Sequence, residues 1–153
     1  MGNCSSGEDI DTNLTANSMF ASNTVGTVIS VALGGATNIP LPNNQNLDSF
    51  IANGTNSIFT VPATGRYYIT YQINTTAAVG IGAGSRVSRN GSPIPGSILR
   101  PVISVATFNN DVIVNLTAGD TISLQLFSSI LLTATLLSTA GSTGAALTII
   151  RVQ

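Results

Sequence analysis

The sequence predicts an all-β protein, an antiparallel sandwich or barrel. Short segments rich in Val, Ile, Leu and Thr recur along the chain, turn residues separate them, and no segment shows the 3.6-residue period of a helix. The composition supports a packed domain, because 43% of the 153 residues are apolar. Charged residues make up only 7%, so Asn, Ser, Thr and Gly supply most of the surface polarity.

The first expected strand covers residues 25–33, a β-branched run that stops at Gly34-Gly35. Residues 38–50 contain two Pro and four Asn, and we expect a long polar loop there. Residues 57–61 predict the next strand, which ends at the turn sequence Pro-Ala-Thr-Gly.

Residues 66–75 show the clearest strand pattern, because their side chains alternate between two faces. One face carries Tyr67, Ile69, Tyr71 and Ile73, and the other carries Arg66, Tyr68, Thr70 and Gln72. The first set predicts a core face. The second set is half apolar, which suits contact with a neighbouring subunit.

A β-hairpin is predicted within residues 85–94, where Asn90-Gly91 lies between extended flanks. Asn-Gly is the strongest short-range signal for a two-residue hairpin turn. Residues 98–107 look strand-like, and Pro101 places that strand at an edge or a bulge.

Residues 111–116 and 121–127 predict a strand pair joined by the turn 117–120, and residues 131–137 and 145–152 complete the chain. The last two strands are aliphatic on both faces, and a strand of that kind is covered on both sides. In a sandwich of this size another copy of the protein can supply the second cover, so we expect an oligomer.

Catalysis is not expected, because the chain contains no His and no Lys. A general base near neutral pH is therefore missing, and Ser–His and Cys–His arrangements are excluded. Asp111 and Asp120 remain as carboxylates, but they lie at opposite ends of one expected strand. Asp120 follows Gly119 and is interpreted as a turn residue. The sequence predicts no enzyme and no cofactor.

Nucleic acid and membranes are not expected as partners. The five Arg residues are scattered and the net charge is −1, so no cationic cluster for phosphate is apparent. The most apolar window, residues 130–137, is too short to span a bilayer. No cationic segment precedes an apolar stretch, so we expect synthesis without a signal peptide. Glu8, Asp9 and Asp11 favour a solvated acidic segment over a calcium site.

Residues 1–16 predict a flexible N-terminal arm before a domain of residues 17–153, because the arm has few apolar groups to offset the entropy of ordering. Its start, MGNCSS, fits the N-myristoylation pattern at Gly2. No basic cluster follows to complete a membrane anchor, so we favour coincidence. Cys4 is the single cysteine and is either a free thiol or a candidate for an interchain disulfide.

Four segments together resemble the C-terminal domain of the collagen-like exosporium glycoproteins of Bacillus-type spores, the BclA-type proteins. The segments are FTVPATGRYYITYQINTTAA, SRVSRNGSPI, DVIVNLTAGDTISLQLF and GAALTIIRV. More distantly, Gly65 with Tyr67 and the L-x-x-G-D sequence at 116–120 are similar to the tumour-necrosis-factor and complement jelly roll. The resemblance covers residues 19–153.

The resemblance implies an antiparallel jelly-roll sandwich that forms trimers around a three-fold axis on the spore surface. Such domains are structural or adhesive components. It also implies a trimer interface, for which the candidate residues are Tyr68, Thr70, Gln72, Leu131, Leu132, Leu136 and Leu137. The family's stalk is a collagen-like tract, and here residues 1–16 stand in its place.

A trimer without a stalk can project from a surface by stacking. About 15 extended residues reach at most ~50 Å, enough to bridge adjacent trimers. The expected function is a self-assembling subunit of a spore-surface layer or appendage fibre, in which Cys4, Ile10 and Leu14 make the inter-trimer contact. Other spore-coat or exosporium proteins are additional candidate partners. The alternative is a trimeric lectin-like or adhesive binding head.

Overall fold

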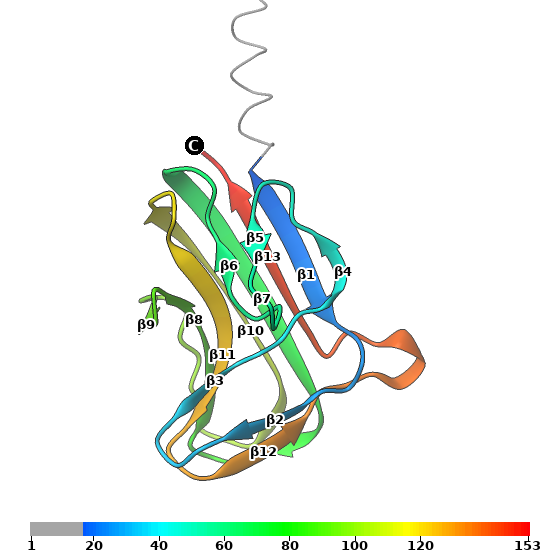
Figure 1. Ribbon diagram of the computed structural model, residues 1–153. Coiled ribbons are helices and arrows are strands. Elements are labelled where there is room, and N and C mark those ends of the chain that lie inside the picture. Colours follow the sequence, from blue (N-terminus) through cyan, green and yellow to red (C-terminus); the bar gives the residue numbers. More distant parts are fainter. Residues whose placement is uncertain (1–16) are drawn as a thin grey trace, which may run out of the picture.

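The computed structural model describes residues 17–153, which form two antiparallel sheets packed face to face (Figure 1). The expected sandwich is therefore confirmed. The elements are β1 (Ser18–Asn23), β2 (Val28–Val31), β3 (Ala36–Asn38), β4 (Asn43–Asn46), β5 (Ile51–Ala52), β6 (Phe59–Thr60), β7 (Gly65–Val79), β8 (Ala83–Arg89), β9 (Ser92–Pro93), β10 (Val105–Leu116), β11 (Thr121–Ser128), β12 (Leu132–Thr135), the 3₁₀ turn η1 (Thr139–Gly141) and β13 (Ala145–Arg151).

The two sheets differ in strand order. The five-stranded sheet runs β10-β7-β13-β1-β4, and the six-stranded sheet runs β5-β6-β11-β8-β9 with β3 paired to β11. Strands β2 and β12 form a separate pair at the end of the sandwich opposite the C-terminus (Figure 1). Strands that are neighbours in a sheet are mostly distant in sequence, so the fold depends on long-range pairing.

The core lies between the sheets, and β7 shows why these residues form it. Tyr67, Ile69, Tyr71 and Ile73 are all buried, as their alternation predicted. The two tyrosines keep their hydroxyls bonded. The Tyr67 hydroxyl donates to the Ala63 carbonyl at 2.6 Å, and the Tyr71 hydroxyl donates to the Ser97 carbonyl at 2.8 Å. Buried polar groups need such partners, and these two have them.

The hairpin at Asn90-Gly91 is confirmed. Strands β8 and β9 pair as Arg89↔Ser92, and both turn residues have positive φ angles, 52° and 84°. A turn of that hand matches the twist of the flanking strands, and Asn and Gly are the residues that adopt it at least cost.

Three segments differ from the expectation, the first being β1, which lies before the first strand that the sequence predicted. Residues 43–46, expected in a loop, form the edge strand β4, which pairs with β1 at Phe20↔Asn46 and Ser22↔Asn43. This strand has no apolar side chain, and polar contacts to Ser22 hold it instead, with the Asn44 amide donating to the Ser22 hydroxyl at 3.0 Å. An edge strand has only one neighbour and tolerates such polarity.

Residues 98–107 were expected as a strand, but β10 begins only at Val105. Leu99 makes an isolated bridge to Ser85, and the chain after it is irregular. Val102 is 84% exposed, so its β-branched side chain has no sheet to pack on. The local pattern was therefore misleading here.

The pair of strands at 131–137 and 145–152 was expected to be apolar and covered on both faces. They do not share a sheet, because β12 pairs with β2 whereas β13 pairs with β7 and β1. In β12 and its flanks, Leu131 is 76% exposed and Leu136 is buried in the core. Leu131 is left uncovered within its own chain, so the expected cover of this segment by another copy stays a prediction.

Strand β1 starts beside the end of β13, where the Arg151 N–H donates to the Asn17 carbonyl at 3.1 Å. The described chain therefore enters and leaves the sandwich at one end. The arm candidates Cys4, Ile10 and Leu14 lie outside the described residues, and what was expected of them stays a prediction.

Candidate functional site

The outer face of the five-stranded sheet is the strongest candidate for a functional surface. Its inner face packs on the core, and its outer face is formed by side chains from four strands in register. We call this outer surface the open face, and it consists of Phe20, Tyr68, Thr70, Gln72, Asn109, Asp111, Ile113, Ala146, Thr148 and Ile150.

The apolar part of the open face is continuous. Ile150 pairs directly with Tyr68, and Tyr68 pairs with Ile113, so the three side chains form one row across β13, β7 and β10. Ile113 is 52% exposed and Ile150 is 37% exposed. Phe20 lies in the next row on β1 and is 38% exposed. Large side chains grouped in this way are typical of a protein-binding surface.

Three of the polar side chains of the open face have hydrogen-bonding partners. The Tyr68 hydroxyl donates to Oδ2 of Asp111 at 2.9 Å, and the Asn74 amide donates to Oε1 of Gln72 at 2.9 Å. Asp111 is the only charged side chain among these ten residues, and Arg66 follows Tyr68 on the same side of β7 toward its start. Asp111 and Gln72 keep these bonds when the face is covered, which lowers the cost of removing them from water.

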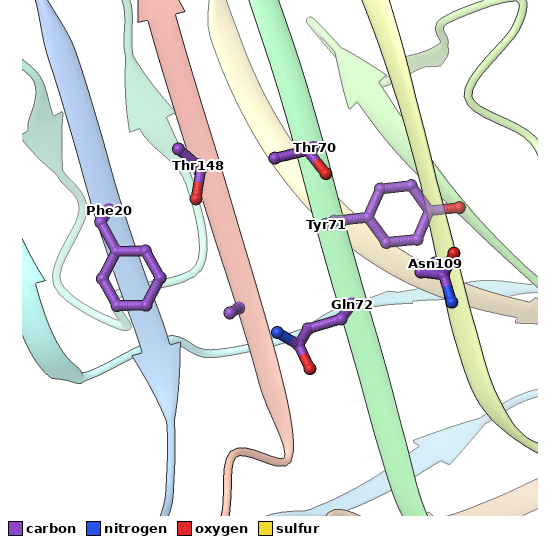
Figure 2. A pocket seen from close by; sticks show the side chains of 7 residues that line it. Phe20, Thr70, Tyr71, Gln72, Asn109 and Thr148 are labelled. Carbon is purple, nitrogen blue, oxygen red and sulfur yellow. The ribbon is translucent and has the colours of Figure 1, made fainter.

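A shallow hollow of about 330 Å³ lies in the open face. Figure 2 shows Phe20 on β1 at one side and Asn109 on β10 at the other, with Thr148, Thr70 and Gln72 between them. The middle of the hollow is low because its residues are small, Ala146 among them. A hollow of this shape fits a protruding side chain of another protein chain.

Acid–base chemistry finds no support at the two carboxylates singled out from the sequence. Asp120 lies in the β10–β11 turn, where its side chain accepts from the Thr117 N–H at 2.9 Å and the Asn90 amide at 3.0 Å. The Thr117 N–H lowers the pKa of Asp120, helped by Asn90 and the charge of Arg89. Asp120 is thus an ionised turn residue, as its sequence context predicted.

Within residues 17–153, no three His, Cys, Asp or Glu side chains come together as a metal site would need. In the same part of the chain, no helix has the length and apolar character to cross a membrane.

The predicted interface residues divide between two places. Tyr68, Thr70 and Gln72 share the open face, as their alternation predicted. The four leucines belong to β12 and its flanks, away from that face: Leu131 is exposed, Leu132 and Leu137 are half-buried, and Leu136 is buried. The Leu136 side chain is inaccessible to a second copy because it packs in the core of its own protomer, so we remove it from the candidates.

Three large apolar residues of the open face were missed from the sequence, namely Phe20, Ile113 and Ile150. Ile113 lies between Val112 and Val114, so apolar residues occupy both faces of β10 there. Alternation therefore does not show which face is the outer one. Phe20 is a single aromatic in a run of small residues, and only the pairing of β1 with β13 brings it to the face.

Comparison with known proteins gives one family and one fold. A model of the BclA C-terminal domain matches residues 19–153. Among solved structures, murine APRIL at pH 8.5 is similar, with a TM-score of 0.62 and 18% identity over 88% of this chain and 98% of that one. The sequence matches no curated protein.

Two other solved structures agree on the fold. The globular domain of zebrafish complement 1qA protein has a TM-score of 0.54 and 14% identity over 90% of this chain and 98% of that one. Eiger TNF from S. frugiperda has a TM-score of 0.56 and 14% identity over 89% of this chain and 91% of that one. The sandwich is thus a jelly roll of the tumour-necrosis-factor and complement type.

Proposed function

The chain belongs to the BclA C-terminal domain family, and on that basis we propose that it is a self-assembling structural subunit of the spore surface, whose trimers stack through residues 1–16. The family makes it the head domain of an exosporium glycoprotein, which is a structural domain and not an enzyme. The exosporium surface is the location that this membership implies. Stacking produces a layer or an appendage fibre.

The proposal of a trimer rests on the open face. Folds of the tumour-necrosis-factor and complement type are typically trimeric. The row of Ile150, Tyr68 and Ile113, with Phe20 beside it, supplies an apolar centre, and the Asp111 carboxylate keeps a hydrogen bond from Tyr68 when the face is covered. Contact with two other copies covers this surface.

Replacing Ile150 with Arg is expected to convert the trimer to monomers at micromolar concentration. Three long charged side chains would have to be desolvated in a largely apolar interface, where the one carboxylate, Asp111, already accepts from Tyr68, and such desolvation is costly. Native mass spectrometry should then show the mass of one chain where the unaltered protein shows three.

The matched control is Ile51→Arg, which adds the same charge at a side chain that is 68% exposed on β5 of the other sheet. It should leave the trimer intact. Circular dichroism should show the same β content for both variants. A trimer that survives Ile150→Arg with a folded spectrum contradicts the assigned interface.

Stacking is assigned to residues 1–16, with Cys4, Ile10 and Leu14 as contact residues. Two observations support it. The described chain starts at one end of the sandwich, so an added segment leaves from that end. The net charge is only −1, so neighbouring trimers repel one another weakly. An extended segment of that length reaches at most ~50 Å, enough to meet the next trimer.

Deletion of residues 1–15 is expected to abolish fibres while leaving trimers. Electron microscopy of the purified full chain should show fibres, and the deletion variant should show discrete particles. Equal fibre formation by both proteins contradicts the role given to this segment. Discrete particles from both would favour the alternative of a trimeric binding head.

A further inference from the structure

A second hollow lies on the outer face of the six-stranded sheet, away from the open face. It measures about 280 Å³, and its lining combines Arg86, Arg100 and Phe127 with small residues of 34–36 and 128–129. The chain has five Arg and no Lys, so this hollow holds two of its five side-chain cations. Nothing in the proposed assembly uses it.

The position of Phe127 depends on a glycine. Phe127 on β11 pairs directly with Gly84 on β8. A Cβ added at Gly84 would lie 2.5 Å from the Phe127 ring and 2.6 Å from the Leu99 carbonyl oxygen. Only glycine therefore lets the ring lie across β8 at this place. The ring becomes a fixed support on the sheet surface.

Both guanidinium groups lie against that ring. The Cζ atom of Arg86 is 4.7 Å from the ring centroid, and that of Arg100 is 5.1 Å away. Each contact is a favourable cation–π interaction. Holding two cations at one ring also places like charges close together, which is unfavourable unless an anion lies near them.

Arg86 is further fixed by side chains beside it in register. Its Nε donates to Oε1 of Gln125 at 2.8 Å, and the Gln125 amide donates to Oδ1 of Asn38 at 2.8 Å. This chain of bonds orients the guanidinium through Nε, so its terminal N–H groups remain to bind a ligand. A planar fork of that kind suits carboxylate and phosphate oxygens.

No protein carboxylate of residues 17–153 serves as the counter-ion. The carboxylates in that part of the chain are Asp48, Asp111 and Asp120. Asp111 bonds Tyr68 on the open face, Asp120 bonds Asn90 in a turn, and Asp48 does not line the hollow. The pKa of Arg86 is lowered, first by burial and then by the charge of Arg100, with no acidic group offsetting either effect. The two cations are uncompensated within the described domain.

We propose that this hollow binds an oxyanion, the carboxylate or phosphate group of a small molecule, between Arg86 and Arg100. Arg86 is the oriented donor, Arg100 is the exposed donor that approaches from the loop after Leu99, and Phe127 supports both. Packing alone would be satisfied by one Arg on the ring, since the second adds repulsion. The site lies on the six-stranded sheet and the open face on the five-stranded sheet, so the residues assigned to the two do not overlap.

Titration of the full chain by nuclear magnetic resonance tests the site, because only five Arg Nε–Hε signals exist. The ligands are inorganic phosphate, glucuronate and, as an uncharged control, glucose, all at constant ionic strength so that screening does not vary. The signals of Arg86 and Arg100 should shift and saturate, while those of Arg66, Arg89 and Arg151 serve as internal references. Saturation by phosphate alone or by glucuronate alone identifies which source of the oxyanion fits.

In the variant Arg100→Gln, the dissociation constant measured from the Arg86 signal should rise roughly tenfold or more, since the ligand loses one charged hydrogen-bonding partner. Arg89→Gln removes the same charge three residues along β8 and does not line the hollow, so the shift should persist unchanged. Arg100 is exposed, so its replacement leaves the core intact. The proposal is overturned if no ligand gives saturation, if all five signals move in parallel, or if glucose acts like the anions.

Discussion

Replacing Phe59 with Ala should lower the free energy of unfolding by about 3–5 kcal/mol, the usual cost of removing a fully buried aromatic side chain. Phe59 is 0% exposed on β6, which lies between β5 and β11 in the six-stranded sheet. It pairs with Ile122, itself buried, so the lost ring leaves a cavity in the core. Urea denaturation at one fixed subunit concentration measures the change.

A suitable control is Ile51→Ala on the adjacent strand β5, where the side chain is exposed. Its free energy of unfolding should stay within about 0.5 kcal/mol of that of the unaltered protein. If Phe59→Ala cost less than about 1 kcal/mol, the packing described around β6 would be wrong.

Gly144→Val is expected to have the second large effect, a loss of stability of about 1–3 kcal/mol or more, from overpacking against backbone. A Cβ at Gly144 would lie 2.6 Å from the Leu137 carbonyl oxygen and 2.7 Å from the Leu136 Cβ. The residue cannot shift freely, because its N–H donates to the Asn23 carbonyl and its own carbonyl accepts from the Asn74 N–H.

The paired control for that substitution is Gly54→Val. No atom lies within 4 Å of a Cβ added at Gly54, and its φ angle is not positive. Thermal unfolding of the two valine variants should separate them clearly. Equal melting temperatures would contradict the close approach at Gly144.

The sequence was sufficient to predict the structure of a segment where a local rule decides it. Alternation in residues 66–75 predicted the face of each side chain in β7, because a strand buried on one side must alternate. Asn90-Gly91 predicted the hairpin, because its turn requires residues that accept positive φ. In both cases the signal and its cause lie within ten residues.

The sequence was insufficient to predict the structure of a segment where that structure depends on residues distant in the chain. β4 has no apolar residue, and it is a strand only because β1 offers it an edge. Val102 and Ile103 look like strand residues, yet nothing covers them. The hollow at Phe127 requires Arg86 and Gln125 to be neighbours across strands, a pairing that no local pattern carries.

The entry of the chain at Asn17 has a mechanical consequence for an assembly under tension. β1 is paired with β13 over six residue positions, and the hydrogen bonds of an antiparallel pair lie perpendicular to the strands. A pull on Asn17 along β1 therefore loads these bonds together, in shear, and does not open them one by one from an end. In such a domain, the hydrogen bonds between β1 and β13 would bear the applied force.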